Sequence, residues 1–242
     1  HRWFEPDPSP QPLIPFGGEQ IGLSICEDLW ANPWGQESIR YALNPIEDLV
    51  KQGASLLINA SVSPANLGAW SPPKPYMGIR PSKAEQRKKI LLDQAQHYKT
   101  PIIFASRVGA DSSLIYDGSS GMASAKGQWQ GAPAFQEGLV WVDTQKNGHA
   151  WTVLEDMHWL RKALVTGIRD NFQKQGVEGA IVGMSGGLDS AVVATLAREA
   201  LGSSKVLGVA LPSLVTSSES IRLAEQQCKK LGIELRMISI TE

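Results

Sequence analysis

The chain has 242 residues and a formal net charge of −1, from 23 basic and 24 acidic side chains. This balance excludes a general binder of the nucleic-acid backbone, which needs a basic excess. No apolar run reaches the roughly 18 residues that a membrane-spanning helix needs, so we expect no membrane association. The two cysteines, Cys26 and Cys228, disfavour a disulfide framework and favour a reducing, cytoplasmic compartment.

In the first 144 residues, short apolar runs alternate with helical patterns. The apolar runs contain β-branched residues and predict buried strands at 20–26, 54–60 and 101–108. Helical periodicity predicts helices within 37–53 and 82–99, and Pro45 leaves the start of the first one open. Glycine-punctuated hairpins are expected at 113–124, 125–131 and 138–144. This part is therefore expected to be α/β with an antiparallel end.

The remaining residues read as a second unit. A polar stretch predicts a linker over 145–157, and an amphipathic pattern predicts a helix over 155–176. Beyond it, strands are expected at 179–184, 205–212 and 234–240, and helices at 190–202 and 218–232. This alternation predicts a doubly wound parallel sheet over 158–242. Cys228, in the last helical pattern, is expected to be a core or half-buried thiol.

The sequence GMSGGLDS follows the first strand of that second unit. A strand that enters a helix through a glycine turn presents backbone N–H groups to an anion, and the helix dipole adds positive charge. Glycine permits a positive φ and the close approach of a phosphate, and the two serines can donate hydrogen bonds. The predicted phosphate site consists of Gly183, Met184, Ser185, Gly186, Gly187, Leu188, Asp189 and Ser190.

Asp189 is unusual in a phosphate site, because a carboxylate repels phosphates unless a cation lies between them. A Mg²⁺ ion that bridges Asp189 and a polyphosphate resolves this conflict. The loop lacks both the GK[ST] ending of a Walker A motif and the GxGxxG pattern of dinucleotide-binding folds. The alternative is a plain strand–helix turn, in which glycine caps the helix and Asp189 lies in its first turn.

The SGGxDS pattern resembles the pyrophosphate loop of the N-type ATP pyrophosphatases. The resemblance implies an enzyme that splits ATP between the α and β phosphates and adenylates a carboxyl or carbonyl oxygen. A nitrogen or sulfur nucleophile then displaces AMP. It also implies that adenine and ribose lie at the end of the second strand, within 210–220. Several families share the loop, so the substrate stays open at this point.

Cys26 ends an apolar strand and precedes Glu27 and Asp28. A thiol is a weak nucleophile until it ionises, and two carboxylates disfavour the thiolate, so a catalytic role needs partners from elsewhere in the chain. The usual alternative for a cysteine in a strand is a buried structural thiol. However, ICEDLW resembles the nucleophile turn of the nitrilase-type carbon–nitrogen hydrolases, which use a Glu–Lys–Cys triad.

Together, the two motifs and similar stretches over essentially the whole chain resemble the glutamine-dependent NAD(+) synthetase family. The resemblance implies a nitrilase-like α-β-β-α sandwich over 1–144, which would be a glutaminase domain that lacks its N-terminal part. A linker over 145–157 precedes a Rossmann-like, doubly wound ATP-pyrophosphatase domain over 158–242, which lacks its C-terminal part. A homo-oligomer is also implied.

The implied reaction is the ATP-dependent amidation of deamido-NAD to NAD, with release of AMP and pyrophosphate and with ammonia from glutamine. It needs ATP and Mg²⁺ and no tightly bound organic cofactor. By the same resemblance, Cys26 is the nucleophile and the backbone N–H of Glu27 contacts the oxyanion. Ser61 and Ser63 fall in the region that holds glutamine, and Ser63 is favoured. Residues 183–190 hold ATP, with Asp189 on Mg²⁺.

The chain departs from the family pattern at several places. The Glu and Lys of the triad precede the cysteine in this family and match no residue here. A basic residue commonly follows the glycine of the serine loop, whereas here Ala69 stands in that place and Arg80 is the alternative. Leu214 and Val215 replace an Arg-Tyr pair of the ATP domain. Another SGGxDS amidoligase with a nitrilase-type ammonia source, or a catalytically silent scaffold or binding module, therefore stays open.

Overall fold

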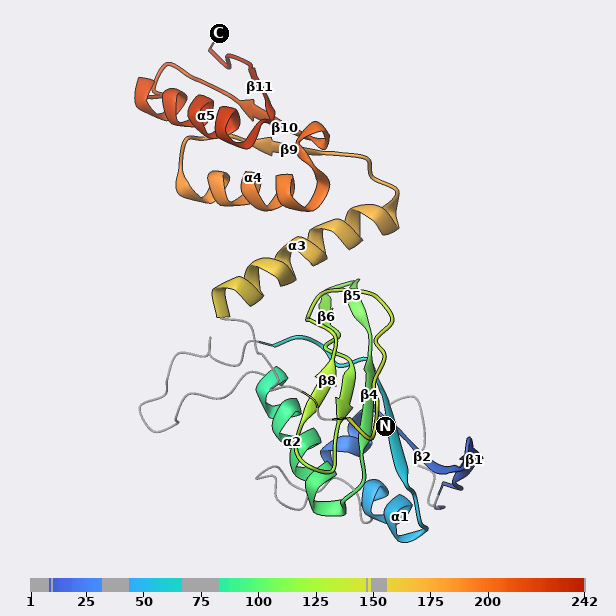
Figure 1. Ribbon diagram of the computed structural model, residues 1–242. Helices are drawn as coiled ribbons and strands as arrows, with labels where there is room; N and C mark the ends of the chain where they lie inside the picture. The colour runs from blue at the N-terminus through green and yellow to red at the C-terminus, as the bar shows by residue number, and fades with distance from the viewer. Residues whose placement is uncertain are drawn as a thin grey trace. The chain divides into compact units, whose positions relative to one another are not determined.

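The computed structural model describes residues 9, 11–31, 44–66, 83–146, 148 and 156–241. The chain divides into two compact units (Figure 1): unit 1 comprises residues 1–108 and 116–156, and unit 2 comprises 109–115 and 157–242. Ala69 and Arg80 lie outside the described residues. Across the described residues, no helix combines the length and the apolar character that crossing a membrane requires.

Unit 1 is built on a six-stranded mixed sheet with the strand order β1-β2-β3-β4-β7-β8. Its strands are β1 (Ile14–Phe16), β2 (Glu19–Ile25), β3 (Leu56–Ser61), β4 (Ile102–Ser106), β7 (Gly121–Ala123) and β8 (Trp129–Gly131). β2, β3 and β4 are parallel, and the other neighbouring pairs are antiparallel. A two-stranded sheet pairs β5 (Val108–Asp111) with β6 (Leu114–Asp117). The three strands that the apolar runs predicted are the parallel ones.

The described residues of unit 1 form three helical segments: the 3₁₀ helix η1 (Cys26–Trp30), α1 (Pro45–Lys51) and α2 (Lys83–Tyr98). Asn44 caps α1, because its Oδ1 accepts hydrogen bonds from the backbone N–H groups of Ile46 (3.1 Å) and Glu47 (3.3 Å). Pro45 is the first helical residue, a position where the missing N–H forfeits no helical hydrogen bond. Pro45 made the start of this helix uncertain in the sequence, and in the structure it is the residue at which the helix begins.

The core of unit 1 lies on one face of the sheet, against α1 and α2. The buried cluster consists of Leu29, Ile46, Leu49, Ala54, Leu57, Leu91, Ala95, Ile102, Phe104, Ala123 and Trp129. A Cβ on Gly22 of β2 would lie 2.9 Å from Leu57 and 3.1 Å from Leu49. The missing side chain at this position is what allows α1 to pack closely on the sheet.

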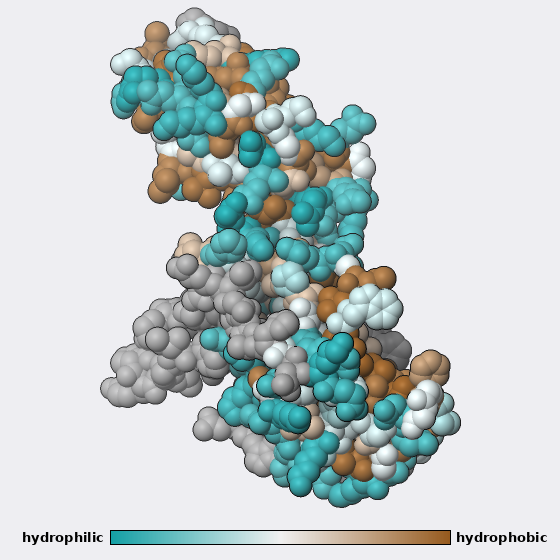
Figure 2. Space-filling model, viewed as in Figure 1, coloured by the Kyte–Doolittle hydropathy of each residue, from teal (hydrophilic) through white to brown (hydrophobic). Residues whose placement is uncertain are grey.

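The opposite face of the sheet is also apolar. The register aligns Leu23, Ile58 and Ile103 on this face, and Ile25 continues it to the end of β2. Leu23 and Ile25 are exposed, and Figure 2 shows apolar side chains gathered over β2 and β4 on this side of unit 1. Apolar sheet faces are normally covered by a further layer. In the α-β-β-α sandwich that the resemblance implies, this is the face that a second sheet covers.

The prediction of a hairpin strand at 138–144 is wrong, because these residues form no strand. Leu139 and Trp141 are 94% and 93% exposed. A side chain takes the place of a partner strand: Gln130 Nε2 donates to the carbonyl oxygen of Asp143 (2.8 Å), and Gln130 Oε1 accepts from its N–H (2.9 Å). An alternating apolar pattern predicts a strand only where a neighbouring backbone is available for pairing.

Unit 2 holds a three-stranded parallel sheet with the order β11-β10-β9. Its elements are α3 (Asp156–Gln175), β9 (Ala180–Gly183), α4 (Leu188–Leu201), η2 (Ser203–Lys205), β10 (Val206–Ala210), α5 (Ser218–Leu231) and β11 (Glu234–Met237). This strand order is that of one half of a doubly wound sheet. The predicted alternation of strands and helices is therefore confirmed.

The core of unit 2 joins α4 and α5 to the same face of this sheet. Its buried residues are Val182, Met184, Ala194, Ala197, Val206, Ala224, Cys228 and Ile233. Cys228 is a buried free thiol, as expected, and burial raises its pKa. A Cβ on Gly208 would lie 2.9 Å from the Sγ of Cys228, so α5 packs on β10 through this glycine. Arg161 of α3 pairs with Glu199 of α4 through two hydrogen bonds of 2.8 Å.

The α/β class expected for both parts of the chain is confirmed by these sheets and helices. The assignment of 1–144, 145–157 and 158–242 to a glutaminase domain, a linker and an ATP-pyrophosphatase domain remains a prediction.

A buried ion pair ties α2 to β6 inside unit 1. Arg87 Nη2 lies 2.6 Å from Asp117 Oδ2, and both side chains are only 1% exposed. Ser119 donates to the same carboxylate oxygen (2.9 Å), and the guanidinium carbon lies 5.2 Å from the centre of the Phe104 ring. A buried ion pair adds little net stability compared with apolar residues, but removal of one partner leaves an uncompensated charge.

Arg87→Met is expected to lower the free energy of unfolding by about 3–5 kcal/mol, because it leaves the buried carboxylate of Asp117 without its cation. Urea denaturation followed by circular dichroism measures the loss. The matched control is Lys89→Met on the same helix, whose ion pair with Asp93 is exposed, and this variant should be close to wild type.

A double variant separates the charge from the packing. Asp117→Asn added to Arg87→Met should recover part of the lost stability, since no charge is then buried. Equal losses from Arg87→Met and Lys89→Met would contradict the structural role of the buried pair.

Candidate functional site

Cys26 stands where β2 ends and η1 begins, and it is half-buried. Its φ of +45° lies in the left-handed region, which a residue with a side chain adopts only when its surroundings enforce it, at a cost of about 1–3 kcal/mol. A nucleophile on a strained strand-to-helix turn is a recurrent arrangement in hydrolases, because the turn presents the side chain at the strand end. The backbone conformation therefore favours the catalytic interpretation over a structural thiol.

Glu27 follows at the amino-terminal end of η1. Backbone N–H groups at such an end point away from the helix and are suited to an anion. The place of Glu27 is compatible with an oxyanion contact, and its role stays a prediction.

The two candidate serines follow β3 and are distinguished by their hydrogen bonds. Ser61 Oγ donates to Asn59 Oδ1 (2.7 Å), and Asn59 Nδ2 in turn donates to Ser24 Oγ (3.0 Å). Ser63 is only 3% exposed, and its hydroxyl has no hydrogen-bond partner among the described residues. Buried polar groups are normally satisfied, so an unpaired buried hydroxyl is available to a ligand. The structure thus supports Ser63 over Ser61 as the glutamine-contacting residue.

Parallel pairing brings these groups to one edge of the sheet. The register pairs Ile25 with Ala60, so Cys26 and Ser61 come next at the carboxyl ends of β2 and β3. It also pairs Ser61 with Ser106 of β4, whose buried hydroxyl likewise lacks a described partner. The sequence reasoning missed Ser106. The available signal was its place at the end of the third predicted parallel strand.

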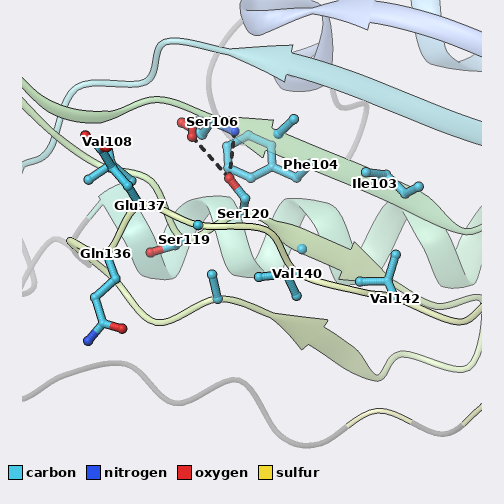
Figure 3. Close-up of a pocket in the computed structure, with 14 residues that line it drawn as sticks. Ile103, Phe104, Ser106, Val108, Ser119, Ser120, Gln136, Glu137, Val140 and Val142 are labelled. Atoms are coloured by element: carbon cyan, nitrogen blue, oxygen red, sulfur yellow. Dashed lines mark hydrogen bonds between the residues drawn. The ribbon is translucent and has the colours of Figure 1, made fainter.

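A separate hollow of about 370 Å³ lies against β4 and β7 (Figure 3). Its apolar lining includes Ile103, Phe104, Val108, Val140 and Val142. At its edge, Ser120 Oγ accepts from the N–H of Ser106 (2.9 Å) and donates to its carbonyl oxygen (3.1 Å), as the dashed lines show. Ser106 lines this hollow, whereas Cys26 and Ser63 are not among its lining residues.

In unit 2, the predicted phosphate loop is a tight turn from β9 into α4. Gly186 has φ +79°, and a Cβ there would lie 2.3 Å from the carbonyl oxygen of Ser220, so only glycine fits. Ser185 Oγ accepts from the N–H of Gly187 (3.2 Å) and lies 3.1 Å from Ser190 Oγ. Ser190 Oγ donates to the carbonyl oxygen of Gly187 (3.0 Å). The serines therefore hold the loop at the amino-terminal end of a 14-residue helix.

An open groove of about 560 Å³ adjoins this loop. It is lined by Gly183, Met184, Ser185, Val209, Ala210, Leu211, Pro212, Val215, Thr216, Ser217, Ser220 and Ile221. These residues follow the carboxyl ends of β9 and β10, where open α/β sheets bind their ligands. The groove thus joins the phosphate loop to the segment expected to hold adenine and ribose. Val215 lines it, whereas Leu214 does not.

Asp189 lies in the first turn of α4 with its side chain exposed. Within the described part of the chain, no group of three or more His, Cys, Asp or Glu residues could hold a metal by itself. Mg²⁺ at nucleotide sites typically takes one or two carboxylates and fills its remaining positions with phosphate oxygens and water. A single carboxylate beside a phosphate loop fits that requirement.

Comparison with known proteins shows what each part of the chain is similar to. The NAD synthase family model matches residues 160–242. The chain is 36% identical to a glutamine-dependent NAD(+) synthetase of Synechocystis sp., in an alignment that covers 91% of the chain. It is 30% identical to that of Thermotoga maritima, in an alignment that covers the whole chain. It superposes on an ADP-bound glutamine-dependent NAD+ synthetase of Acinetobacter baumannii with a TM-score of 0.82, at 25% identity and over 99% of the chain.

The chain spans 38%, 44% and 42% of the lengths of these three proteins. The similarity extends over both units, so it includes the Cys26 turn and the Gly186 loop together. Over both units, the chain is therefore similar to glutamine-dependent NAD(+) synthetases.

Proposed function

We propose that the protein to which this chain belongs makes NAD from deamido-NAD, ATP and glutamine. Glutamine is hydrolysed at Cys26 in unit 1, and the ammonia amidates an adenylated nicotinate carboxylate at the ATP site of unit 2. One observation carries the proposal. A single chain combines a left-handed cysteine turn with a nearby buried serine that has no partner among the described residues, and with a glycine loop that adjoins a groove. The similarity to glutamine-dependent NAD(+) synthetases names the substrates.

In the glutaminase step, the thiolate of Cys26 attacks the side-chain carbonyl carbon of glutamine. The negative charge then develops on the carbonyl oxygen, near the N–H groups at the start of η1, which include that of Glu27. Collapse of this intermediate, with protonation of the leaving nitrogen, releases ammonia and leaves a glutamyl thioester that water hydrolyses to glutamate. The resemblance assigns the proton transfers to the triad Glu, which matches no residue of this chain.

In the synthetase step, the nicotinate carboxylate of deamido-NAD attacks the α-phosphorus of ATP and pyrophosphate leaves. Ammonia then displaces AMP from the adenylate and forms the amide of NAD. The loop over 183–190 supplies backbone N–H groups for the phosphates, and the groove beyond β10 takes the nucleoside. The ADP bound to the related Acinetobacter baumannii protein supports a nucleotide ligand.

We further propose that Mg²⁺ is held by Asp189 and the phosphates of ATP. Bound there, it would offset the charge of the polyphosphate and favour the departure of pyrophosphate. Three further points stay predictions. The partners are small-molecule substrates and not nucleic acid, the location is cytoplasmic, and the protein is a homo-oligomer.

The first test removes the nucleophile. In the complete protein, Cys26→Ala should abolish NAD formation from glutamine and retain NAD formation from ammonium, because only the ammonia source is lost. Reduction of the product NAD by alcohol dehydrogenase measures both rates. Cys228→Ala, which removes the buried thiol of unit 2, should retain both activities. Loss of both activities in a folded Cys26→Ala protein would contradict a two-site enzyme, and a wild type inactive with both nitrogen sources would favour a silent scaffold.

The second test concerns the serines after β3. Ser63→Ala should raise the KM for glutamine by about tenfold, which is the effect of one lost hydrogen bond, and should change kcat less. Ser61→Ala is the matched control, because the hydroxyl hydrogen of Ser61 is already donated to Asn59. It should lower the unfolding midpoint with little effect on KM. The reverse assignment would follow if Ser61→Ala alone raised KM.

The third test concerns the metal. Asp189→Asn should lower synthesis from glutamine and from ammonium alike, by about a hundredfold, because both routes share the ATP step. The Mg²⁺ concentration needed for half-maximal rate should rise as well. Glu199→Gln, which neutralises a carboxylate near the other end of α4, should leave the Mg²⁺ dependence unchanged. Unchanged ATP consumption and Mg²⁺ dependence in Asp189→Asn would rule out this ligand.

A further inference from the structure

The Cys26 turn needs restraints, because a left-handed residue with a side chain relaxes unless its surroundings hold it. Cys26 has φ +45° and is only half-buried, so core packing of its own side chain is incomplete. Two hydrogen bonds from side chains hold the turn at its two ends. One comes from Asp28 inside the turn, and the other comes from Gln94 on α2.

Asp28 closes the first end of the turn. Its Oδ2 accepts from the backbone N–H of Ile25 at 2.7 Å, which links the last residue of β2 to the third residue of η1. Cys26 and Glu27 lie inside this closed ring. The backbone carbonyl oxygen of Asp28 also accepts from the N–H of Ala31 (3.3 Å), which continues the turn beyond η1. The backbone around Cys26 is thus fixed relative to β2.

Gln94 holds the second end from a distant part of the sequence. Its Nε2 donates to the carbonyl oxygen of Leu29 at 2.9 Å, between residues 65 positions apart. Both residues are fully buried, at 0% exposure. Leu29 belongs to the apolar core of unit 1, so the amide of Gln94 anchors η1 in a rigid environment.

Stability alone does not account for an amide at this position. Gln94 Oε1 is buried and has no hydrogen-bond partner among the described residues. A buried unpaired polar atom costs at least as much as a single neutral hydrogen bond returns. A methionine of similar volume would remove that unpaired atom, but it would also leave the carbonyl oxygen of Leu29 without this donor. Local rules are broken in this way mainly at functional sites, and this site adjoins the candidate nucleophile.

We propose that Gln94 and Asp28 are positioning residues for glutamine hydrolysis, which hold η1 so that the sulfur of Cys26 keeps its attack geometry. The inference rests on the proposed function of Cys26. Neither residue is proposed to bind glutamine. Their loss therefore changes the rate of the chemical step and leaves substrate affinity nearly unchanged.

The main experiment compares Gln94→Met with Gln96→Met in the complete protein. Gln96 lies on the same helix and is exposed, so it controls for the chemical change. Gln94→Met should lower the kcat of glutamine hydrolysis by about 10- to 100-fold and keep KM within about threefold of wild type. Its unfolding midpoint should fall, because the carbonyl oxygen of Leu29 loses its donor, but the protein should stay folded and synthesis from ammonium should be unchanged. Gln96→Met should match wild type in all four measurements.

A second pair of variants tests the other end of the turn and does not alter the core. Asp28→Ala removes the acceptor and should lower kcat as Gln94→Met does. Asp28→Asn keeps an acceptor oxygen of the same reach and should recover most of the rate. This rescue would not follow from a general loss of stability, and it decides the question if Gln94→Met fails to fold.

The outcomes distinguish a failure of the positioning role from a failure of the proposed function. If the wild type hydrolyses glutamine, two results would overturn the positioning role alone. One is an unimpaired kcat in folded Gln94→Met, and the other is equal rates in Asp28→Ala and Asp28→Asn. Absence of glutamine hydrolysis in the wild type would overturn the proposed function and this inference with it.

Discussion

Both candidate sites depend on how the chain leaves a parallel strand. Cys26 follows β2 with φ +45°, and Gly186 lies just beyond β9 with φ +79°. A left-handed residue turns the backbone sharply, so the next helix begins at the strand end with its N–H groups directed outward. Because parallel strands end at the same edge of a sheet, residues from neighbouring strands gather there. In unit 1 this constraint brings Ser61 and Ser106 into register beside the cysteine turn.

The two units meet this constraint with different residues for a chemical reason. In unit 2 the backbone itself binds the proposed ligand, so glycine serves, and the carbonyl oxygen of Ser220 leaves no room for a side chain at Gly186. In unit 1 the side chain at the turn is the proposed nucleophile and glycine is excluded. The conformational strain must then be met by other groups, and hydrogen bonds from Asp28 and Gln94 hold the turn.

The parts of the fold that depend on local pattern could be predicted from the sequence. Apolar runs identified β2, β3 and β4, and periodicity identified α2, α4 and α5. The error at 138–144 has a physical cause, because Gln130 supplies by side chain what a partner strand would have supplied. Ser106 and Gln94 were missed for a similar reason. The importance of Gln94 comes from a contact 65 residues away, which no local pattern encodes, and that of Ser106 comes from the register of β4 with β3.

By itself, the sequence determined the α/β class, the glycine turn after β9 and the two motifs whose combination resembles the glutamine-dependent NAD(+) synthetases, because these depend on residue types at short spacing. Only the tertiary structure distinguished the hydroxyl groups of Ser61 and Ser63, since both stand in one short stretch and only that of Ser61 donates to Asn59. It also revealed that Cys26 is conformationally strained and that a glutamine 65 residues from Leu29 helps to hold its turn. Backbone strain and buried hydrogen bonds are properties of packed elements, and they exist only once those elements have come together.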